Sequence, residues 1–235
     1  MILEKFVMLL APTSRSKAYL QCMCKNNIYP EKIFIMTNDT EKISNRTDSG
    51  NETSIGYFDM DEPLLETIQK NKLVYEIIKT EDVNSDEVYE LLISTNYEYI
   101  IYSGYGGAIL KPRLFNIGKK IIHVHAGKLP QYRGSTTAYY SMLDYGKISA
   151  TAMFMNERLD DGNIIYTMDF NIPDDGVNID YIFEPYTRAT VLVNCLKNYI
   201  ENGCFKIQEQ NGYEAETYYI IHPILKHIAL LKFNY

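Results

Sequence analysis

Two histidines separated by one residue end an apolar run in the middle of the chain. The run is Ile121–His125, and it holds His123 and His125, half of the four histidines in the sequence. Side chains two positions apart on a strand share one face, so we expect both imidazoles to point the same way. An imidazole titrates near neutral pH and can donate, accept or shuttle a proton, or bind a metal ion. The pattern therefore predicts a chemically active strand end.

Two later turns supply further polar side chains. The first, Leu129–Gly134, reads LPQYRG, and its proline and glycine shape a connection from strand to helix. The second, Leu159–Gly162, reads LDDG and is typical of a tight turn. Its Asp160 gains chemical interest if folding brings it to the histidines, because a carboxylate can stabilise a charged imidazole.

The elements that must position these residues alternate between strand and helix. Short apolar runs predict strands at Phe6–Ala11, Lys32–Met36, Leu73–Ile78, Tyr97–Tyr102, Ile121–His125, Ala150–Met155 and Ile164–Phe170. Helices are expected at Ser14–Lys25 with Ser14 as the cap, Pro63–Lys70, Ser85–Ser94, Thr136–Tyr145 and Ile179–Glu201. The polar stretch Thr37–Ser54 is expected to be an exposed or mobile loop.

This alternation predicts an α/β fold with a mostly parallel sheet covered on both faces. Sites in such sheets lie beyond the carboxyl ends of the strands. The rule selects two loops, Gly104–Gly107 and the one that follows His125. We expect a catalytic domain at residues 1–201 and a short C-terminal extension at 202–235 that packs on the core or on a dimer partner.

Taken together, the motifs resemble the formyltransferase family, which includes the methionyl-tRNA, glycinamide ribonucleotide and nucleotide-sugar N-formyltransferases. The family pattern is an Asn-x-His at a strand end, a Leu-Pro-x-Tyr-x-Gly loop, and a later (Ile/Leu)-Asp-x-Gly turn. The matching residues here are His123–His125, Leu129–Gly134 and Leu159–Gly162. The resemblance covers about residues 102–170 and implies a three-layer Rossmann-like fold. It also implies a formyl donor, N10-formyltetrahydrofolate, and no metal.

The resemblance implies roles residue by residue. His125 matches the family's catalytic histidine, and Asp160 matches its catalytic aspartate. His123 stands where the family has asparagine, whose side chain donates a hydrogen bond to the formyl oxygen. An imidazole N–H can also donate, so His123 could keep that role, or the change could mean altered or lost activity. If both imidazoles were charged they would repel, so we expect one to stay neutral at pH 7.

The binding residues follow by the same comparison. The implied cofactor-binding residues are Tyr105, Gly106, Gly107, Ile109, Asn156 and Glu157. The implied substrate-binding residues are Tyr132, Arg133, Gly134 and Ser135.

Composition helps to sort the possible acceptors. The chain has 23 basic and 30 acidic residues, a net charge of −7, which disfavours a nucleic-acid partner and hence a tRNA acceptor. The tRNA enzymes also resemble one another in a further C-terminal domain, for which the residues after Glu201 are expected to be too few. The segment Ala11–Ser16 lacks the glycines of the ribonucleotide enzymes' phosphate loop. A nucleotide-linked amino sugar is therefore the favoured acceptor.

The remaining expectations concern location and alternatives. The chain has no apolar run near the about 18 residues of a membrane span and no disulfide framework, so a cytoplasmic protein without membrane contact is expected. Tyrosines of the tail, Tyr213, Tyr218, Tyr219 and Tyr235, could stack on a nucleobase, form a homodimer face, or belong to a strand packed on the core. Two other functions stay open: a metal-dependent hydrolase that uses the His-x-His pair, and a catalytically inactive binding relative.

Overall fold

The computed structural model describes residues 1–46, 56–174, 176–210 and 215–233. The chain forms two compact units, Met1–His123 and Val124–Tyr235. The strand that carries both histidines of the sequence motif spans the point where the first unit ends and the second begins.

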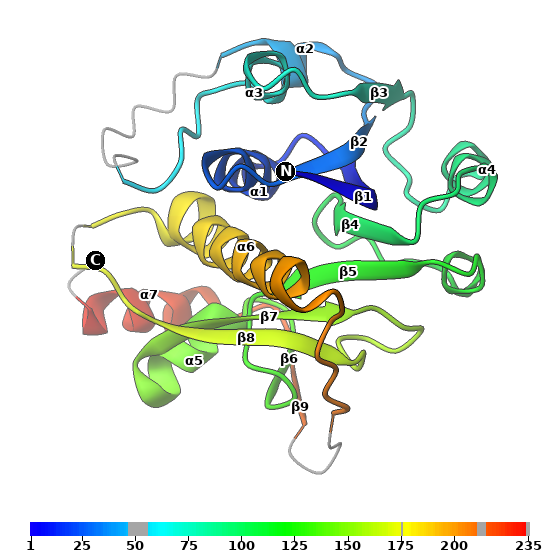
Figure 1. The fold of residues 1–235 in the computed structure, drawn as a ribbon. Coiled ribbons are helices and arrows are strands. Elements are labelled where there is room, and N and C mark those ends of the chain that lie inside the picture. Colours follow the sequence, from blue (N-terminus) through cyan, green and yellow to red (C-terminus); the bar gives the residue numbers. More distant parts are fainter. Residues whose placement is uncertain (47–55, 175, 211–214, 234–235) are drawn as a thin grey trace. The chain divides into compact units, whose positions relative to one another are not determined.

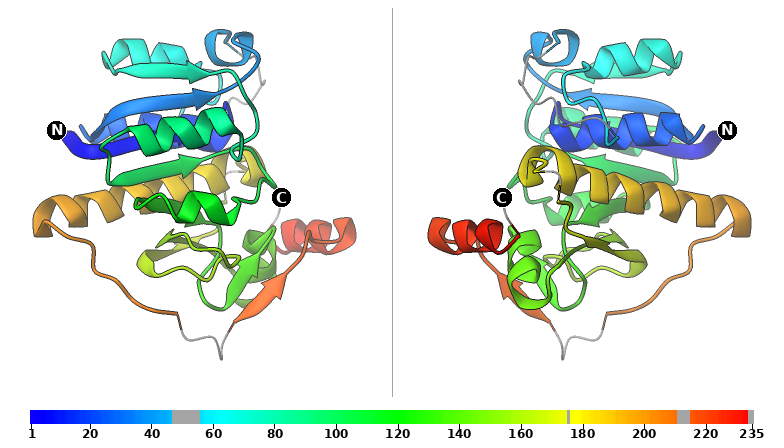
Figure 2. Two further views of the ribbon diagram at one scale, coloured as in Figure 1. Left: turned by 90° about the vertical axis from the view of Figure 1, so that its right-hand side faces the viewer. Right: turned by 90° about the vertical axis from the view of Figure 1, so that its left-hand side faces the viewer.

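The first unit is a parallel sheet with helices on both faces. Its elements are β1 (Ile2–Leu10), α1 (Ser14–Lys25), β2 (Tyr29–Met36), α2 (Glu41–Ser44), α3 (Leu64–Lys70), β3 (Tyr75–Ile78), α4 (Asp86–Ser94), β4 (Tyr99–Ser103), a 3₁₀ turn at Pro112–Phe115, and β5 (Lys120–His125). Strand β1 pairs in parallel with β2 and β4, and helices α1 and α4 lie on opposite faces of these strands (Figures 1 and 2). Because both faces are covered, every residue of Phe6–Leu10 is buried.

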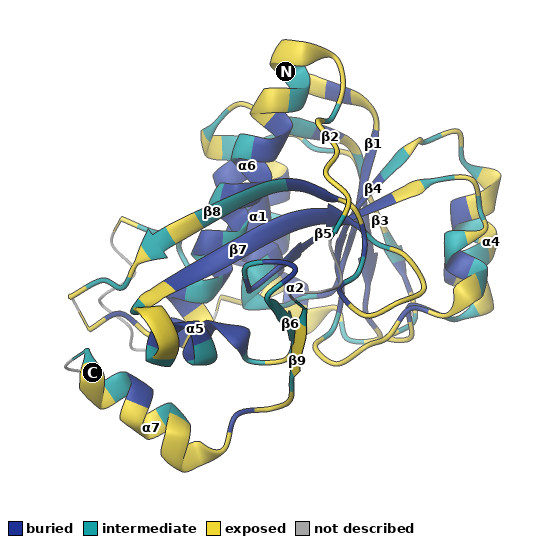
Figure 3. Cartoon of the chain, turned by 90° about the horizontal axis from the view of Figure 1, so that it is seen from below, coloured by how far each residue is buried: buried dark blue, intermediate teal, exposed yellow. Residues whose placement is uncertain are grey.

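The second unit carries the two sequence turns. Its elements are β6 (Tyr132–Gly134), α5 (Thr137–Tyr145), β7 (Lys147–Phe154), β8 (Ile164–Asn171), a π-helical turn at Ile179–Phe183, α6 (Glu184–Asn202), β9 (Glu216–Tyr218) and α7 (Pro223–Lys232). Strands β7 and β8 pair antiparallel, α6 packs on both of them, and α5 packs on β7. Strand β9 lies beside β6, as Figure 3 shows, and α7 packs on α5.

The strand connectivity confirms the predicted fold class. The hydrogen-bonded order of the seven-stranded sheet is β3-β2-β1-β4-β5-β7-β8, and a separate two-stranded sheet pairs β6 with β9. Four of the strand pairs, β1–β2, β1–β4, β2–β3 and β4–β5, are parallel. The chain is therefore an α/β protein with a mostly parallel, Rossmann-like sheet.

Several local expectations need correction. The cap of α1 is Thr13, whose hydroxyl accepts from the Ser16 N–H at 3.2 Å, and not Ser14. The stretch Thr37–Ser54 is not simply an exposed loop, because it forms α2 and buries Ile43; its residues 47–54 lie outside the described residues. Isolated apolar residues in polar surroundings give no periodic signal, which explains why this helix escaped prediction.

The C-terminal extension holds one helix that the sequence did not predict. It forms helix α7 as well as a strand, since Tyr218 lies in β9. Tyr218 stacks on Tyr132 of the same chain, with ring centroids 5.2 Å apart, whereas Tyr219 is exposed. Tyr213 and Tyr235 lie outside the described residues. The domain boundary at residue 201 stays a prediction.

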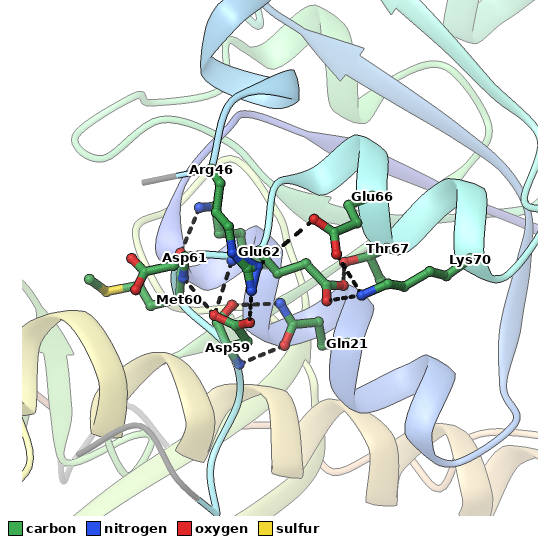
Figure 4. A network of polar contacts seen from close by, with 10 residues as sticks. Gln21, Arg46, Asp59, Met60, Asp61, Glu62, Glu66, Thr67 and Lys70 are labelled. Carbon is green, nitrogen blue, oxygen red and sulfur yellow. Dashed lines mark hydrogen bonds and ion pairs between the residues drawn. The ribbon is translucent and has the colours of Figure 1, made fainter. Parts of the chain in front are cut away.

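Within the first unit, a polar network holds the segment that leads into α3 against helix α1 (Figure 4). The Gln21 side chain of α1 donates to the Asp59 carbonyl at 2.7 Å and accepts the Asp59 N–H at 2.8 Å. The Asp59 carboxylate also pairs with Arg46 at 2.6 Å, and Lys70 pairs with Glu62 at 2.6 Å. The two Gln21 hydrogen bonds satisfy backbone groups of Asp59 that no sheet or helix ladder serves, and the ion pairs link the surrounding side chains.

Candidate active site

His125 stands at the carboxyl end of β5 and is buried, with 4% of its surface exposed. Its Nε2 atom lies 2.6 Å from the backbone oxygen of Tyr132. A carbonyl oxygen only accepts hydrogen bonds, so Nε2 must carry the proton of the neutral ring. The Nδ1 atom is then the position that takes up a further proton.

Asp160 faces that position. Its Oδ2 atom lies 3.5 Å from His125 Nδ1 and accepts the Gly134 N–H at 2.9 Å. The side chain is nearly as buried as that of the histidine, at 9% exposure against 5%. The structure thus brings together the predicted strand-end histidine, the predicted aspartate and the predicted glycine loop within the second unit. The arrangement can accept a proton on the imidazole and stabilise the resulting charge.

The Leu159–Gly162 turn is shaped to present Asp160. Asp160 has a φ of 49°, a left-handed conformation that aspartate tolerates better than most residues. A Cβ atom on Gly162 would lie 1.7 Å from the Phe154 carbonyl oxygen, so the chain can close there only with glycine. The geometry of this turn therefore requires glycine at position 162 and suits aspartate at position 160.

Electrostatics keep His125 neutral near pH 7. Burial is the largest effect and holds the pKa of His125 below its usual value of 6.5. The Asp160 carboxylate opposes this by raising the pKa, while the Arg188 guanidinium lowers it further. A neutral imidazole is the form that can act as a base. Burial is therefore the main reason that the ring is neutral.

The Leu129–Gly134 loop, whose Leu129–Pro130 peptide bond is cis, forms β6. The Tyr132 hydroxyl donates to Asp144 at 2.8 Å, and Arg133 pairs with Asp161 of the aspartate turn. Ser135 donates its N–H to the Tyr218 carbonyl of β9 at 2.9 Å. Much of the predicted substrate-binding loop is thus engaged in holding the second unit together.

His123 and four of the predicted cofactor residues belong to the first unit. The His123 ring is partly exposed and lies 6.2 Å from the Tyr102 ring, between centroids. The Tyr105 hydroxyl donates to the Met36 carbonyl at 3.1 Å, while Gly106 and Gly107 are exposed. Ile109 is 75% exposed.

The other two predicted cofactor residues, Asn156 and Glu157, lie in the second unit just before the aspartate turn. The Asn156 amide donates to the Asp161 carbonyl at 3.2 Å and accepts the Arg158 N–H at 2.9 Å. Glu157 is exposed.

Three further residues support the site and were not found by motif reasoning. The Thr137 hydroxyl donates to the Ala126 carbonyl and lies 3.5 Å from His125 Nε2. Arg188 pairs with Glu184 at 2.5 Å on α6. Gln210 contacts the aspartate turn across 50 residues of sequence, a separation at which no spacing rule operates. Of the three, only Thr137 could have been found from the sequence, because it begins a helix directly after a predicted site loop.

Among the residues that the structure describes, no three His, Cys, Asp or Glu side chains gather in a group that could hold a metal ion. Within the same described ranges, every helix is too short or too polar to cross a membrane.

A buried histidine–aspartate pair on a Rossmann-like sheet defines an α/β protein equipped for proton transfer. The sequence model described as "Formyl transferase" matches residues 4–178, most of the chain. The chain therefore belongs to the formyl transferase family, as the motif resemblance predicted.

Individual relatives agree with this assignment. The methionyl-tRNA formyltransferase of Finegoldia magna is 28% identical over 165 residues, which are 69% of this chain and 52% of that protein. The chain thus spans about half the length of this relative.

Solved structures share the fold. The N-formyltransferase from Helicobacter canadensis, in complex with folinic acid and dTDP-3-aminofucose, matches with a TM-score of 0.59 at 16% identity, over 93% of this chain and 71% of that one. Phosphoribosylglycinamide formyltransferase from Anaplasma phagocytophilum matches with a TM-score of 0.59 at 13% identity, over 91% and 97%.

Proposed function

We propose that the protein is an N-formyltransferase that moves a formyl group from N10-formyltetrahydrofolate to the amine of a small acceptor, a nucleotide-linked amino sugar. The observation that carries the proposal is the contact between His125 Nδ1 and Asp160 Oδ2, at 3.5 Å, inside a formyl transferase domain. Family membership gives the reaction class, and the buried pair supplies a base for it.

His125 performs the proton transfers in this proposal. The neutral ring accepts at Nδ1 the proton that leaves the attacking amine, and Asp160 stabilises the imidazolium that results. The Tyr132 carbonyl holds the opposite nitrogen and fixes the ring. His125 then returns the proton to the folate nitrogen as the formyl group leaves it, so that protons and electron pairs balance.

His123 serves as the hydrogen-bond donor to the formyl oxygen while negative charge develops there. Either ring nitrogen of an imidazole can carry the N–H that asparagine would supply from its amide. The partial exposure of His123, two residues before the end of β5, supports this role. Its Nδ1 atom is buried, so Nε2 is the nitrogen that would donate to a substrate.

The loop after β4 fits a flat donor with polar edges. A Cβ atom on Gly106 or Gly107 would meet nothing within 4 Å, so the backbone there is open. Backbone N–H and C=O groups can bind the edge of a pterin ring, and the exposed Ile109 side chain offers an apolar surface. Tyr105 anchors the start of the loop to β2. The formyl donor, when bound, supplies the one-carbon unit.

Two observations support an amino-sugar acceptor: the net charge of the chain and one solved structure with a similar fold. A net charge of −7 opposes binding of a nucleic acid, which favours a small acceptor over tRNA. The Helicobacter canadensis relative was crystallised with a nucleotide-linked amino sugar and a folate, which supports the same pair here.

The test is a transfer assay with N10-formyltetrahydrofolate and a panel of nucleotide-linked amino sugars, with methionyl-tRNA and glycinamide ribonucleotide as competing acceptors. Mass spectrometry should show that one amino sugar gains a formyl group, and His125→Ala should abolish the transfer while the protein stays folded. Binding of the folate without transfer to any amine, or near-normal turnover of His125→Ala, would contradict the proposal.

A further inference from the structure

The side chain of Gln210 bridges the two loops that build the candidate active site. Its Nε2 atom donates to the Asp160 carbonyl at 2.9 Å and to the Gly162 carbonyl at 2.7 Å. Its Oε1 atom accepts from Arg133 Nη2 at 2.8 Å. Carbonyls only accept and guanidinium groups only donate, so this orientation of the amide is the one that satisfies every partner.

The bridged atoms belong to the turn that carries the carboxylate. Asp160 adopts a left-handed backbone conformation, which costs free energy unless its surroundings hold it. The amide of Gln210 binds the carbonyls of Asp160 and Gly162 and so holds the turn at two points. A shift of about 1 Å in a reacting group can reduce turnover by about 100-fold, so the clamp bears on the chemistry.

The backbone around Gln210 is itself anchored. Gln208, two residues earlier, exchanges two backbone hydrogen bonds with Ile164 of β8, at 2.8 and 2.9 Å. Further along, β9 pairs in parallel with β6, which places Thr217 opposite Arg133. The tail is therefore attached to the core on the N-terminal side of Gln210 and to the predicted substrate loop on its C-terminal side.

We propose that Gln210 is a positioning residue for formyl transfer, which acts through Asp160 by fixing the turn that aims its carboxylate at His125. This inference rests on the proposed function and deepens it. It assigns the C-terminal extension a part in the reaction, although none of its residues belongs to the sequence motifs.

Three single variants separate positioning from packing. Gln210→Ala should lower kcat by about 10- to 100-fold, as loss of a group that orients a reacting residue does elsewhere, with the KM for the folate donor changed by less than about twofold. Gln210→Glu keeps the size and an acceptor for Arg133 but cannot donate to the turn, so it should lose as much activity. Gln208→Ala is the matched control, since Gln208 is exposed and its backbone bonds persist.

A double variant tests whether Gln210 acts through Asp160. If it does, Asp160→Asn combined with Gln210→Ala should be no slower than Asp160→Asn alone, because the positioned carboxylate is already gone. Additive losses would overturn the inference. Full activity in Gln210→Glu would overturn it as well, because the contact with Arg133 would then account for the role.

A measurement that does not depend on formyl transfer distinguishes failure of the positioning role of Gln210 from failure of the proposed function. The groups that shift the pKa of the His125 ring are Asp160 from the turn, Arg188 and Glu184 from α6, and the Tyr132 carbonyl from β6. Only Asp160 is held by Gln210. NMR titration of the His125 ring nitrogens should therefore show a lower pKa in Gln210→Ala than in the wild type or in Gln208→Ala.

An unchanged titration in Gln210→Ala would overturn the positioning role. If the wild type transfers formyl to no acceptor while the titration shifts as expected, the proposed function fails and the structural coupling of Gln210 to Asp160 stands.

Discussion

Replacement of Asp160 by asparagine removes one negative charge beside His125 and nearly preserves the shape of the side chain. Asp160 Oδ2 lies 3.5 Å from His125 Nδ1 and accepts the Gly134 N–H at 2.9 Å. The amide oxygen of asparagine can still accept from Gly134, so we expect the turn to persist. The variant therefore isolates the effect of charge on the imidazole.

The size of the effect follows from the separation of the charges. Two unit charges about 4 Å apart attract by about 4 kcal/mol at an effective dielectric constant of about 20. In Asp160→Asn, the imidazolium formed during proton transfer no longer has most of this attraction. At about 1.4 kcal/mol per tenfold change in rate, kcat should therefore fall by roughly 100- to 1000-fold. The same loss should move the pKa of His125 further below its usual value, since Asp160 is the largest of the influences that raise it.

The assay measures consumption of N10-formyltetrahydrofolate with the accepted amine, together with NMR titration of the His125 ring. The matched control is Asp161→Asn, the adjacent carboxylate, which pairs with Arg133 and with the exposed Arg158. It should keep kcat within about fivefold, a change of about 1 kcal/mol, because Asp161 pairs with Arg133 and Arg158 and not with the His125 ring. Equal losses in the two variants, or a kcat within twofold of wild type for Asp160→Asn, would refute the reasoning.

Further predictions concern packing, pH and the histidine motif. Gly162→Ala should lower the free energy of unfolding by about 2 kcal/mol or more, because the new Cβ atom would overlap the Phe154 carbonyl. Thermal melting measures this loss. Gly106→Ala is the control, because a Cβ atom there meets nothing within 4 Å. The lowered pKa of His125 means that the unfolded chain binds a proton first as pH falls below about 6.5, so stability should decline there by up to about 1.4 kcal/mol per pH unit. Denaturant titrations across this range should show a shallower decline for His125→Gln, and an equal slope would count against a lowered pKa. His123→Asn should retain transfer within about tenfold, since both side chains offer an N–H donor; complete loss of turnover would exclude that role.

Elements with a local signal were predictable. The buried strand around Phe6–Leu10 is an uninterrupted apolar run, and such runs mark strands of a parallel sheet covered on both faces. Helix α1 was predicted over Ser14–Lys25, as observed, although its cap was assigned one residue late. Helices α2 and α7 were missed because their apolar residues lie in short or isolated groups.

The candidate site likewise has a part that could be predicted from the sequence and a part that could not. The motifs at His123–His125, Leu129–Gly134 and Leu159–Gly162 resemble those of the family that the sequence match confirms, and the resemblance implied a shared site. Their spacing alone could not place Asp160 beside His125, a contact that only the structure shows. The contribution of the tail could not be predicted, since Gln210 reaches Asp160 through side-chain and backbone hydrogen bonds that no local pattern encodes.

The sequence by itself determined which residue types stand at the strand end and in the two turns, because strand periodicity and turn chemistry are local properties of the chain. Only the tertiary structure decided their chemical state. Burial of His125 lowers its pKa, the Tyr132 carbonyl selects the nitrogen that carries the proton, and Asp160 faces the other nitrogen. Desolvation and hydrogen-bond geometry depend on atoms far apart in the sequence, so they exist only once the chain has folded.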